Sequence, residues 1–271
     1  MGFLFGIQLY AIIGGHNFMK LFIKNRQNQK MAVVTEKTNS PKGLVFITHG
    51  LGDSKDSPHI KKIARCFQNN HYNVVRFDTT NTFGESDGQF EDANLSTYYQ
   101  DLEDLIAWSK SQDFYQEPFV LCGHSLGAAA SAFYAERYPR KIKGLAPIST
   151  VINAELSQQN YSPEELANWK KTGWLTEDWD GQKIRLKWSY MQAKKKYDLL
   201  KRVHKLTMPV LMVVGELDDS TGPKQQKILF TKLPGRKEFH IIKAAPHTFR
   251  SQVHLNTLSR IMNKWIKSLD K

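Results

Sequence analysis

Cysteine is scarce in this sequence. Among 271 residues only Cys66 and Cys122 occur, which excludes the disulfide framework that stabilises many small secreted domains. Cys122 ends the apolar run 119–122 and is expected to pack as a small hydrophobe. This cysteine usage fits a reducing compartment, so we expect a cytoplasmic location.

Long hydrophobic runs are also missing. Residues 1–19 contain no Asp, Glu, Lys or Arg, but this run is short for a membrane span. It has neither the basic start nor the small-residue cleavage site of a signal peptide. We interpret residues 1–18 as an apolar N-terminal extension. Two origins stay open, an upstream start codon or an amphipathic tether.

Acidic residues are the minority charge. There are 26 Asp and Glu against 38 Lys and Arg, which gives a net charge of +12. The basic residues are scattered and no recognition motif accompanies them, so we expect no nucleic-acid partner. Contact with a membrane surface, through the basic charge or the N-terminal extension, stays open. No metal-ligand cluster or nucleotide fingerprint is apparent, so no cofactor and no metal are expected, and the oligomeric state is not predicted.

Apolar segments and helical periodicity alternate along most of the chain. The expected strands are Lys20–Lys24, Met31–Thr35, Leu44–Thr48, Asn73–Asp78, Phe119–Cys122, Lys141–Ile148, Pro209–Val214 and Glu238–Ile242. The expected helices span residues 58–69, 95–110, 128–138 and 251–269. The first two strands read as an antiparallel hairpin. The remaining alternation predicts an α/β fold with a mostly parallel, twisted sheet and helices on both faces.

The alternation stops after residue 149 and resumes at residue 209. We therefore predict one α/β core, residues 19–149 and 209–271, interrupted by an insertion at residues 150–208. With 41% hydrophobic residues the chain can bury one large core.

The turn between the strand 119–122 and the following helix carries the pattern Gly123-x-Ser125-x-Gly127. Glycine two residues to either side of a serine permits a tight turn that exposes the serine oxygen at the edge of the sheet. The free N–H groups of the following helix suit a developing oxyanion. This pattern predicts a nucleophilic serine.

A serine hydroxyl needs a base and a group that orients the base. Asp218 and Asp219 follow the strand ending at Val214, and His247 follows the strand ending at Ile242. Each candidate therefore lies just beyond the end of a strand. Only one of the two neighbouring aspartates can face the histidine. The spacing from Gly215 favours Asp218.

The chain order Ser125, Asp218, His247 resembles that of the α/β-hydrolases. The segments 83–88 and 134–139, Phe-Gly-Glu-Ser-Asp-Gly and Tyr-Ala-Glu-Arg-Tyr-Pro, resemble the branch of monoacylglycerol lipases, cinnamoyl or feruloyl esterases and serine aminopeptidases of the S33 type. Ala128 departs mildly, because many members have a second glycine there. A serine nucleophile argues against epoxide hydrolases and haloalkane dehalogenases, which use aspartate.

The resemblance implies further roles. The backbone N–H groups of Leu51 and Leu126 would form the oxyanion hole. His49, on the wrong strand for the base, would pack in its turn, and Asp78 would hold the loop beside the nucleophile. In this fold an insertion at residues 150–208 forms a lid. Its tryptophans either line an apolar pocket or pack the lid onto the body, and they are Trp169, Trp174, Trp179 and Trp188.

The expected function is hydrolysis of small apolar acyl or aryl esters through an acyl-enzyme, with a small-molecule ester as the partner. A peptidase, thioesterase or acyltransferase with the same triad is the first alternative. A non-catalytic binding protein on the same fold is the second.

Overall fold

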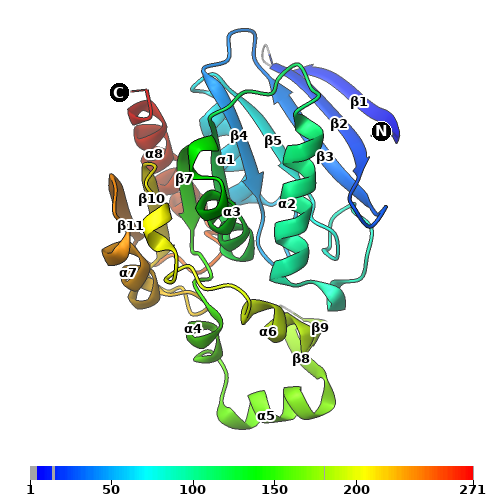
Figure 1. The fold of residues 1–271 in the computed structure, drawn as a ribbon, viewed down its shortest axis with the longest axis vertical. Helices are drawn as coiled ribbons and strands as arrows, with labels where there is room; N and C mark the ends of the chain where they lie inside the picture. The colour runs from blue at the N-terminus through cyan, green and yellow to red at the C-terminus, as the bar shows by residue number, and fades with distance from the viewer. Residues whose placement is uncertain (1–4, 14–15, 180, 271) are drawn as a thin grey trace.

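The computed structural model describes residues 5–13, 16–179 and 181–270, with only the backbone described before residue 18. In this part of the chain the main sheet has nine strands (Figure 1). In spatial order they are β1 (Phe5–Ile13), β2 (His16–Lys24), β3 (Lys30–Lys37), β5 (Tyr72–Phe77), β4 (Gly43–Thr48), β6 (Phe119–His124), β7 (Ile142–Ile148), β10 (Val210–Gly215) and β11 (Lys237–Ile242).

The six strands from β5 to β11 run parallel to one another, which confirms the predicted parallel sheet. Strands β1, β2 and β3 pair antiparallel, and β3 joins the parallel block antiparallel to β5. The predicted opening hairpin is therefore confirmed as β2 and β3. The central strands β4, β5 and β6 are buried along their whole length. Such continuous apolar runs are typical of strands covered on both faces.

The segment expected as an N-terminal extension lies partly in the sheet. Strand β2 begins at His16 and runs through residue 18 without interruption, and β1 pairs along it. Among the described residues no structural break marks the expected boundary after residue 18. Residues 1–4 and 14–15 lie outside the described part.

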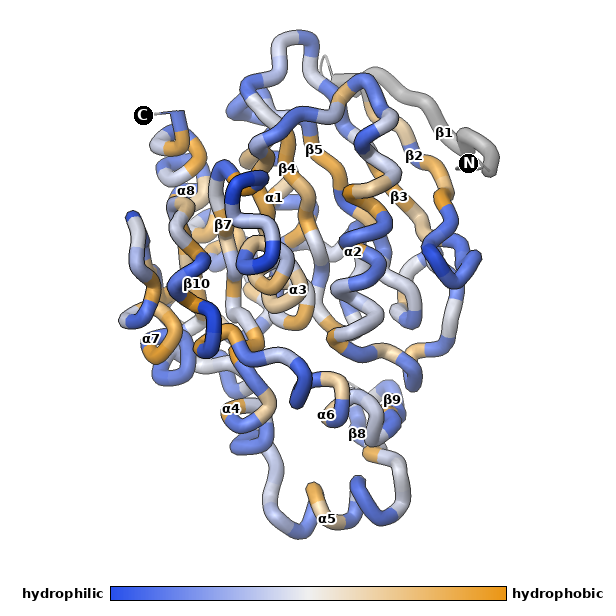
Figure 2. The backbone as a smooth tube through the Cα atoms, in the orientation of Figure 1, coloured by the Kyte–Doolittle hydropathy of each residue, from blue (hydrophilic) through white to orange (hydrophobic). Residues whose placement is uncertain are grey.

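Helices cover both faces of the sheet (Figure 1). On one face lie α2 (Leu95–Ser109) and α3 (Ser125–Arg137), and on the other α1 (Pro58–Gln68) and α8 (Gln252–Ser268). A fifth helix, α7 (Pro223–Lys232), follows β10. Two buried clusters match these faces, and Figure 2 shows hydrophobic residues along the strands between the helices. Helix α1 illustrates the cause, because Ile60, Ile63 and Phe67 recur at helical spacing and are fully buried. Each such side chain stabilises the fold by roughly 1.5–3 kcal/mol.

Between β7 and β10 the chain leaves the main sheet and forms a separate insertion beyond its lower edge in Figure 1. Its elements are α4 (Ala154–Gln158), α5 (Pro163–Thr172), β8 (Trp174–Trp179), β9 (Gln182–Lys187), α6 (Ser189–Lys194) and a 3₁₀ turn, Val203–Lys205. Its two ends are joined, because Asn153 forms a bridge with Asp198 and the Leu199 N–H donates to the Ile152 carbonyl at 3.1 Å. We call these four residues the neck of the insertion.

In the described part of the chain, no helix combines the length and apolar character needed to cross a bilayer.

Candidate active site

Ser125 occupies a sharp turn between β6 and α3. Its φ is +53°, a left-handed conformation that costs a residue with a side chain of the order of 1 kcal/mol or more. A Cβ on Gly123 would lie 2.6 Å from backbone atoms of Gly127, and a Cβ on Gly127 would lie 2.2 Å from the His49 carbonyl oxygen. Neither clash can be relieved by a side-chain movement. The two glycines of the pattern are therefore required by backbone contact.

The loop after β4 passes beside this turn. A Cβ on Gly50 would meet the Ser125 Cβ at 3.1 Å. The peptide bond between Gly50 and Leu51 therefore begins close to the serine. Leu126 is the second residue of α3, where helix N–H groups have no partner within the helix. The two N–H groups expected to bind an oxyanion thus come from segments that meet at Ser125.

Asp218 and His247 form a direct pair. The His247 Nδ1 donates to the Asp218 Oδ2 at 2.8 Å, and the Asp218 side chain is fully buried. The other oxygen of the same carboxylate accepts from the N–H groups of Ser220 and Thr221 at 3.0 and 2.8 Å. Burial raises the pKa of Asp218, but the hydrogen bond and charge of His247 lower it further, so that the pKa falls to about 2. The carboxylate is ionised at neutral pH.

The loops that carry this pair are held together by backbone contacts. The Leu217 N–H donates to the Ala245 carbonyl at 2.9 Å. A Cβ on Gly215, at the end of β10, would lie 2.3 Å from that same oxygen, so glycine lets the two loops approach. Because β10 and β11 are parallel neighbours, their carboxyl ends place Asp218 and His247 side by side.

His124 links this pair to the nucleophile turn. Its Nε2 lies 2.8 Å from the carbonyl oxygen of His247, and the two imidazole rings are 4.7 Å apart. Ser125 is the next residue along the chain. The structure therefore brings Ser125, Asp218 and His247, which are far apart in sequence, to one edge of the sheet. Since Nδ1 of His247 carries the hydrogen shared with Asp218, Nε2 is the nitrogen that can accept a proton.

His49 and Asp78 support the surrounding loops. The His49 Nε2 accepts from the Thr79 N–H at 3.1 Å, and its Nδ1 donates to the Gly50 carbonyl at 2.7 Å. Burial lowers the pKa of His49, so the ring is neutral. The fully buried Asp78 accepts from both the backbone N–H and the Nζ of Lys55, at 2.7 and 3.0 Å. It therefore fixes the loop after β4 to the end of β5.

The four tryptophans of the insertion have different surroundings. Trp169 is fully buried, donates from Nε1 to the Leu186 carbonyl at 3.1 Å and packs against Trp188. Trp174 lies beneath the Arg185 guanidinium, 3.9 Å from the ring centre. Trp169 thus packs inside the insertion, which is one of the two roles that the sequence left open for these tryptophans.

Trp179 is the tryptophan of the insertion that reaches the nucleophile region. A Cβ on Gly52 would lie 2.5 Å from its ring, and Gly52 directly follows Leu51. On its other side Trp179 packs edge-on against Phe90 at 5.7 Å, and Phe90 stacks on Phe83 at 4.3 Å. The two phenylalanines were not selected from sequence as site residues. Phe83 begins the segment 83–88, which resembles the family, but nothing in the sequence places it next to a tryptophan almost 100 positions away.

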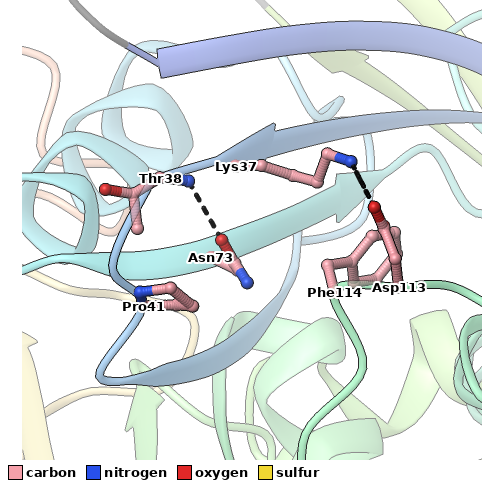
Figure 3. A pocket seen from close by; sticks show the side chains of 6 residues that line it. All are labelled: Lys37, Thr38, Pro41, Asn73, Asp113 and Phe114. Atoms are coloured by element: carbon pink, nitrogen blue, oxygen red, sulfur yellow. Dashed lines mark hydrogen bonds and ion pairs between the residues drawn. The ribbon is translucent and has the colours of Figure 1, made fainter.

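A small pocket of about 210 Å³ lies elsewhere. It is lined by Lys37, Thr38, Pro41, Asn73, Asp113 and Phe114 (Figure 3). Its walls include residues next to the amino ends of β4 and β5, whereas Ser125 follows the carboxyl end of β6. This pocket is therefore not part of the candidate site.

Comparison with solved structures shows one common fold. Est1E from Butyrivibrio proteoclasticus, in a structure with ferulic acid bound, is 21% identical with a TM-score of 0.74, over 96% of this chain and 98% of that one. Mouse alpha/beta hydrolase domain-containing protein 10 is 19% identical with a TM-score of 0.76, over 92% and 99%. The esterase domain of a Rhodothermus marinus protein is 19% identical with a TM-score of 0.70, over 93% and 98%.

A search of curated proteins gave no match. The sequence model of the family described as serine aminopeptidase, S33, matches residues 39–180, which is just over half of the chain and includes Ser125 with both of its glycines. Asp218 and His247 lie beyond the matched range. On this match, and in agreement with the fold, the chain is an α/β-hydrolase and belongs to the S33 serine aminopeptidase family.

Proposed function

We propose that this protein hydrolyses carboxylic esters through an acyl-enzyme intermediate. The observation that carries the proposal is the 2.8 Å bond between His247 and the buried Asp218. The backbone of His247 also contacts His124, the residue before Ser125. A serine on a strained turn, with an imidazole held by a carboxylate nearby, has the parts that nucleophilic acyl transfer requires.

Each group has a defined role in this reaction. Ser125 attacks the ester carbonyl while His247 accepts its proton and then delivers it to the leaving alcohol. Asp218 holds the ring orientation and stabilises the imidazolium. The backbone N–H groups of Leu51 and Leu126 would bind the oxyanion, where a single donor contributes about 3–4 kcal/mol. Water then attacks the acyl-enzyme by the same route and releases the acid.

The substrate class follows from the aromatic side chains beside the oxyanion loop. Trp179, Phe90 and Phe83 form a continuous row of aromatic rings that starts at Gly52, and such a wall favours a flat or apolar acyl group. Est1E, which has this fold, is described with bound ferulic acid, an aromatic acid. We therefore propose small aryl or apolar acyl esters as substrates and the insertion, residues 150–208, as a lid over the site.

The test is a substrate panel on the wild-type protein and Ser125→Ala. The panel contains p-nitrophenyl esters of increasing acyl length, methyl ferulate, aminoacyl p-nitroanilides and acyl-CoA thioesters. We expect the esters to be turned over fastest, and Ser125→Ala to lower kcat on the order of 10⁶-fold. Preferred cleavage of the anilides or thioesters would instead assign a peptidase or a thioesterase.

A fluorophosphonate probe distinguishes an enzyme from a binding protein. We expect it to label the wild type and Ser131→Ala, whose buried serine lies on the same helix, but not Ser125→Ala. A wild-type protein that is folded and resists the probe would overturn the proposal.

A further inference from the structure

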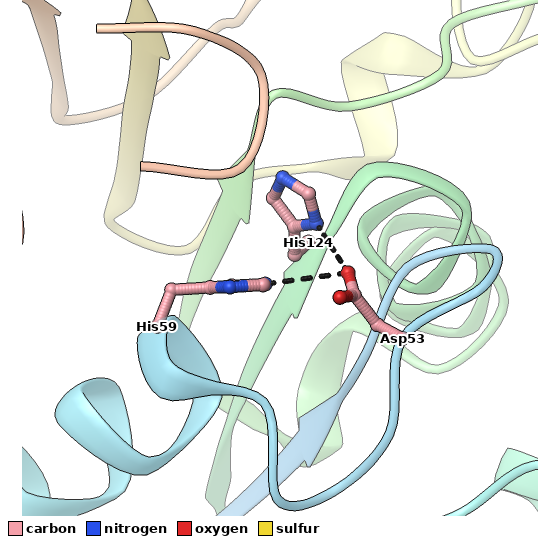
Figure 4. A group of neighbouring side chains, drawn as sticks. All are labelled: Asp53, His59 and His124. Carbon is pink, nitrogen blue, oxygen red and sulfur yellow. Dashed lines mark ion pairs between the residues drawn. The ribbon is translucent and has the colours of Figure 1, made fainter. Parts of the chain in front are cut away.

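A buried cluster of two histidines and one aspartate lies beneath the nucleophile turn (Figure 4). Asp53 comes from the loop after β4, His59 from the first turn of α1 and His124 from the end of β6. The Asp53 Oδ2 lies 3.4 Å from the His59 Nε2 and 3.4 Å from the His124 Nδ1. The His59 and His124 side chains are 3% and 1% exposed. Both rings point a nitrogen at the same carboxylate oxygen.

Neither of these nitrogens has a hydrogen-bond partner. A buried polar atom without a partner is rare and calls for a physical reason. Direct hydrogen bonds between imidazolium and carboxylate are typically about 2.7–2.9 Å long, shorter than both contacts. Two ligands of a tetrahedral zinc ion, with bonds of about 2.0–2.1 Å, lie roughly 3.3–3.4 Å apart. These two distances therefore fit ligands around an ion better than direct hydrogen bonds, and all three ligand atoms lie within 4.8 Å of one another.

The surroundings also suit metal ligation. The His124 Nε2 lies 2.8 Å from the His247 carbonyl oxygen, which can only accept, so Nε2 carries a hydrogen and Nδ1 is the nitrogen that can offer a lone pair to an ion. The Asp53 Oδ1 accepts from the Ser57 hydroxyl at 3.1 Å. Ligands of metal ions are commonly oriented by such outer hydrogen bonds. Gly50 keeps the centre open, because a Cβ there would lie 2.8 Å from the His124 Nδ1 and 3.1 Å from the Asp53 Oδ2.

We propose that Asp53, His59 and His124 bind a divalent transition-metal ion of the zinc type, with water as the fourth ligand. Two imidazoles and a carboxylate are a donor set that zinc takes. The site is distinct from the Ser125 chemistry and does not depend on the proposed esterase activity. It joins the loop after β4, helix α1 and the residue before the nucleophile, so the ion would stabilise the fold around the site.

Metal binding is tested on the full-length chain without an affinity tag, after removal of metal with a chelator. We expect one equivalent of zinc per chain to survive dialysis, measured by elemental mass spectrometry. Cobalt should give the visible absorption of a tetrahedral ion, without the near-ultraviolet thiolate band, because the cluster consists of Asp53, His59 and His124 and includes no cysteine. Zinc should displace the cobalt and raise the Tm.

Variants locate the ion. His59→Gln and Asp53→Asn should each weaken zinc binding at least about 100-fold and abolish the rise in Tm. The control is His240→Gln, which alters another histidine–carboxylate pair, with Glu238 at 3.3 Å on β11, and should bind zinc as the wild type does. Circular dichroism of the metal-free proteins checks their folding. If neither ligand variant folds, zinc absorption-edge spectroscopy of the wild type decides, with two imidazole ligands expected.

Two results would overturn the proposal. In the first, the folded wild type binds no zinc or cobalt. In the second, zinc binds but His59→Gln and Asp53→Asn retain its affinity, so that the ion lies elsewhere on the protein.

Discussion

Asp218 and Asp219 show how neighbouring residues of the same type take different positions. The Asp218 carboxylate is buried and accepts from His247, whereas the Asp219 Oδ1 accepts from the Ser220 hydroxyl at 3.3 Å. Only the first carboxylate can orient the imidazole. The sequence favoured Asp218 through its spacing from Gly215, and the contacts agree with that choice.

We therefore expect Asp218→Asn to lower kcat about 10⁴-fold, because the amide cannot stabilise the imidazolium or hold the same tautomer. Asp219→Asn is the matched control and should keep nearly full activity. Both are measured as ester turnover, with Tm recorded alongside. Equal losses in the two variants would contradict the assigned role of Asp218.

Lys194 is a second residue with an unusual environment. It is buried in α6, with its Nζ 4.2 Å from the centre of the Tyr190 ring. Burial lowers its pKa to about 7, and the charge of Glu177 only partly opposes this effect. The unfolded chain, with an ordinary lysine pKa near 10.4, therefore binds more protons between about pH 7 and pH 10 than the folded chain does. Stability must rise with pH across this window.

Lys194→Met removes that penalty while keeping the length of the side chain. We expect the variant to be more stable than the wild type by about 4 kcal/mol at pH 7, with the difference shrinking toward pH 10. Exposed Lys195, replaced in the same way, is the control and should show no such trend. Urea unfolding at both pH values measures the effect, and a difference that grows with pH would refute it.

At the scale of elements, the turn at Ser125 could be predicted from sequence because backbone sterics leave few alternatives. Gly123 and Gly127 each meet main-chain atoms at less than 3 Å if a Cβ is added, and such constraints recur as a short pattern. Asp218 and His247 could be predicted to lie close together because parallel strands end at a common edge. The strands were predictable for a different reason, because strands buried on both faces appear in the sequence as continuous apolar runs.

Other elements left no comparable signal. His59 and His124 are 65 residues apart, and a single histidine in an amphipathic helix is usually a packing residue, so their convergence on Asp53 could not be predicted. Strand β1 lacks charged residues and was interpreted as an extension. In the insertion the tryptophan content was visible, but whether each ring packs or faces a substrate depends on contacts such as that of Trp179 with Gly52.

Strand β8 gives a prediction of its own, since Trp174 and Trp179 stand at its two ends. Trp179→Ala should reduce kcat/KM for aryl esters about 5- to 30-fold, which corresponds to about 1–2 kcal/mol of lost apolar contact, with little effect on acetyl esters. Trp174→Ala, at the end that packs under Arg185, should leave both substrates unchanged. If only the Trp174 variant lost the preference for aryl esters, the acyl group would contact the Trp174 end of β8, and the role proposed for Trp179 would be wrong.

At the scale of the whole molecule, the insertion and the body share one core. The larger buried cluster joins Trp169, Ile184 and Met191 of the insertion to Phe46 and Leu121 of the central strands. The insertion therefore does not behave as a separate domain in its packing, although it lies outside the main sheet.

Unfolding should accordingly be a single cooperative transition. Four of the six tryptophans lie in the insertion, so tryptophan fluorescence reports mainly on this segment, while far-ultraviolet circular dichroism reports on the whole chain. The two guanidinium curves should coincide. A fluorescence transition at clearly lower denaturant would show that the insertion melts independently.

The neck has a consequence for engineering. Because Asn153 and Ile152 are bonded to Asp198 and Leu199, everything between them leaves and re-enters the body at nearly one point. Transplanting the intervening segment from a related scaffold, cut at these four positions, would exchange the proposed lid while leaving every strand of the main sheet in place. Insertions with a different substrate specificity could therefore be exchanged at the neck without redesign of the main sheet.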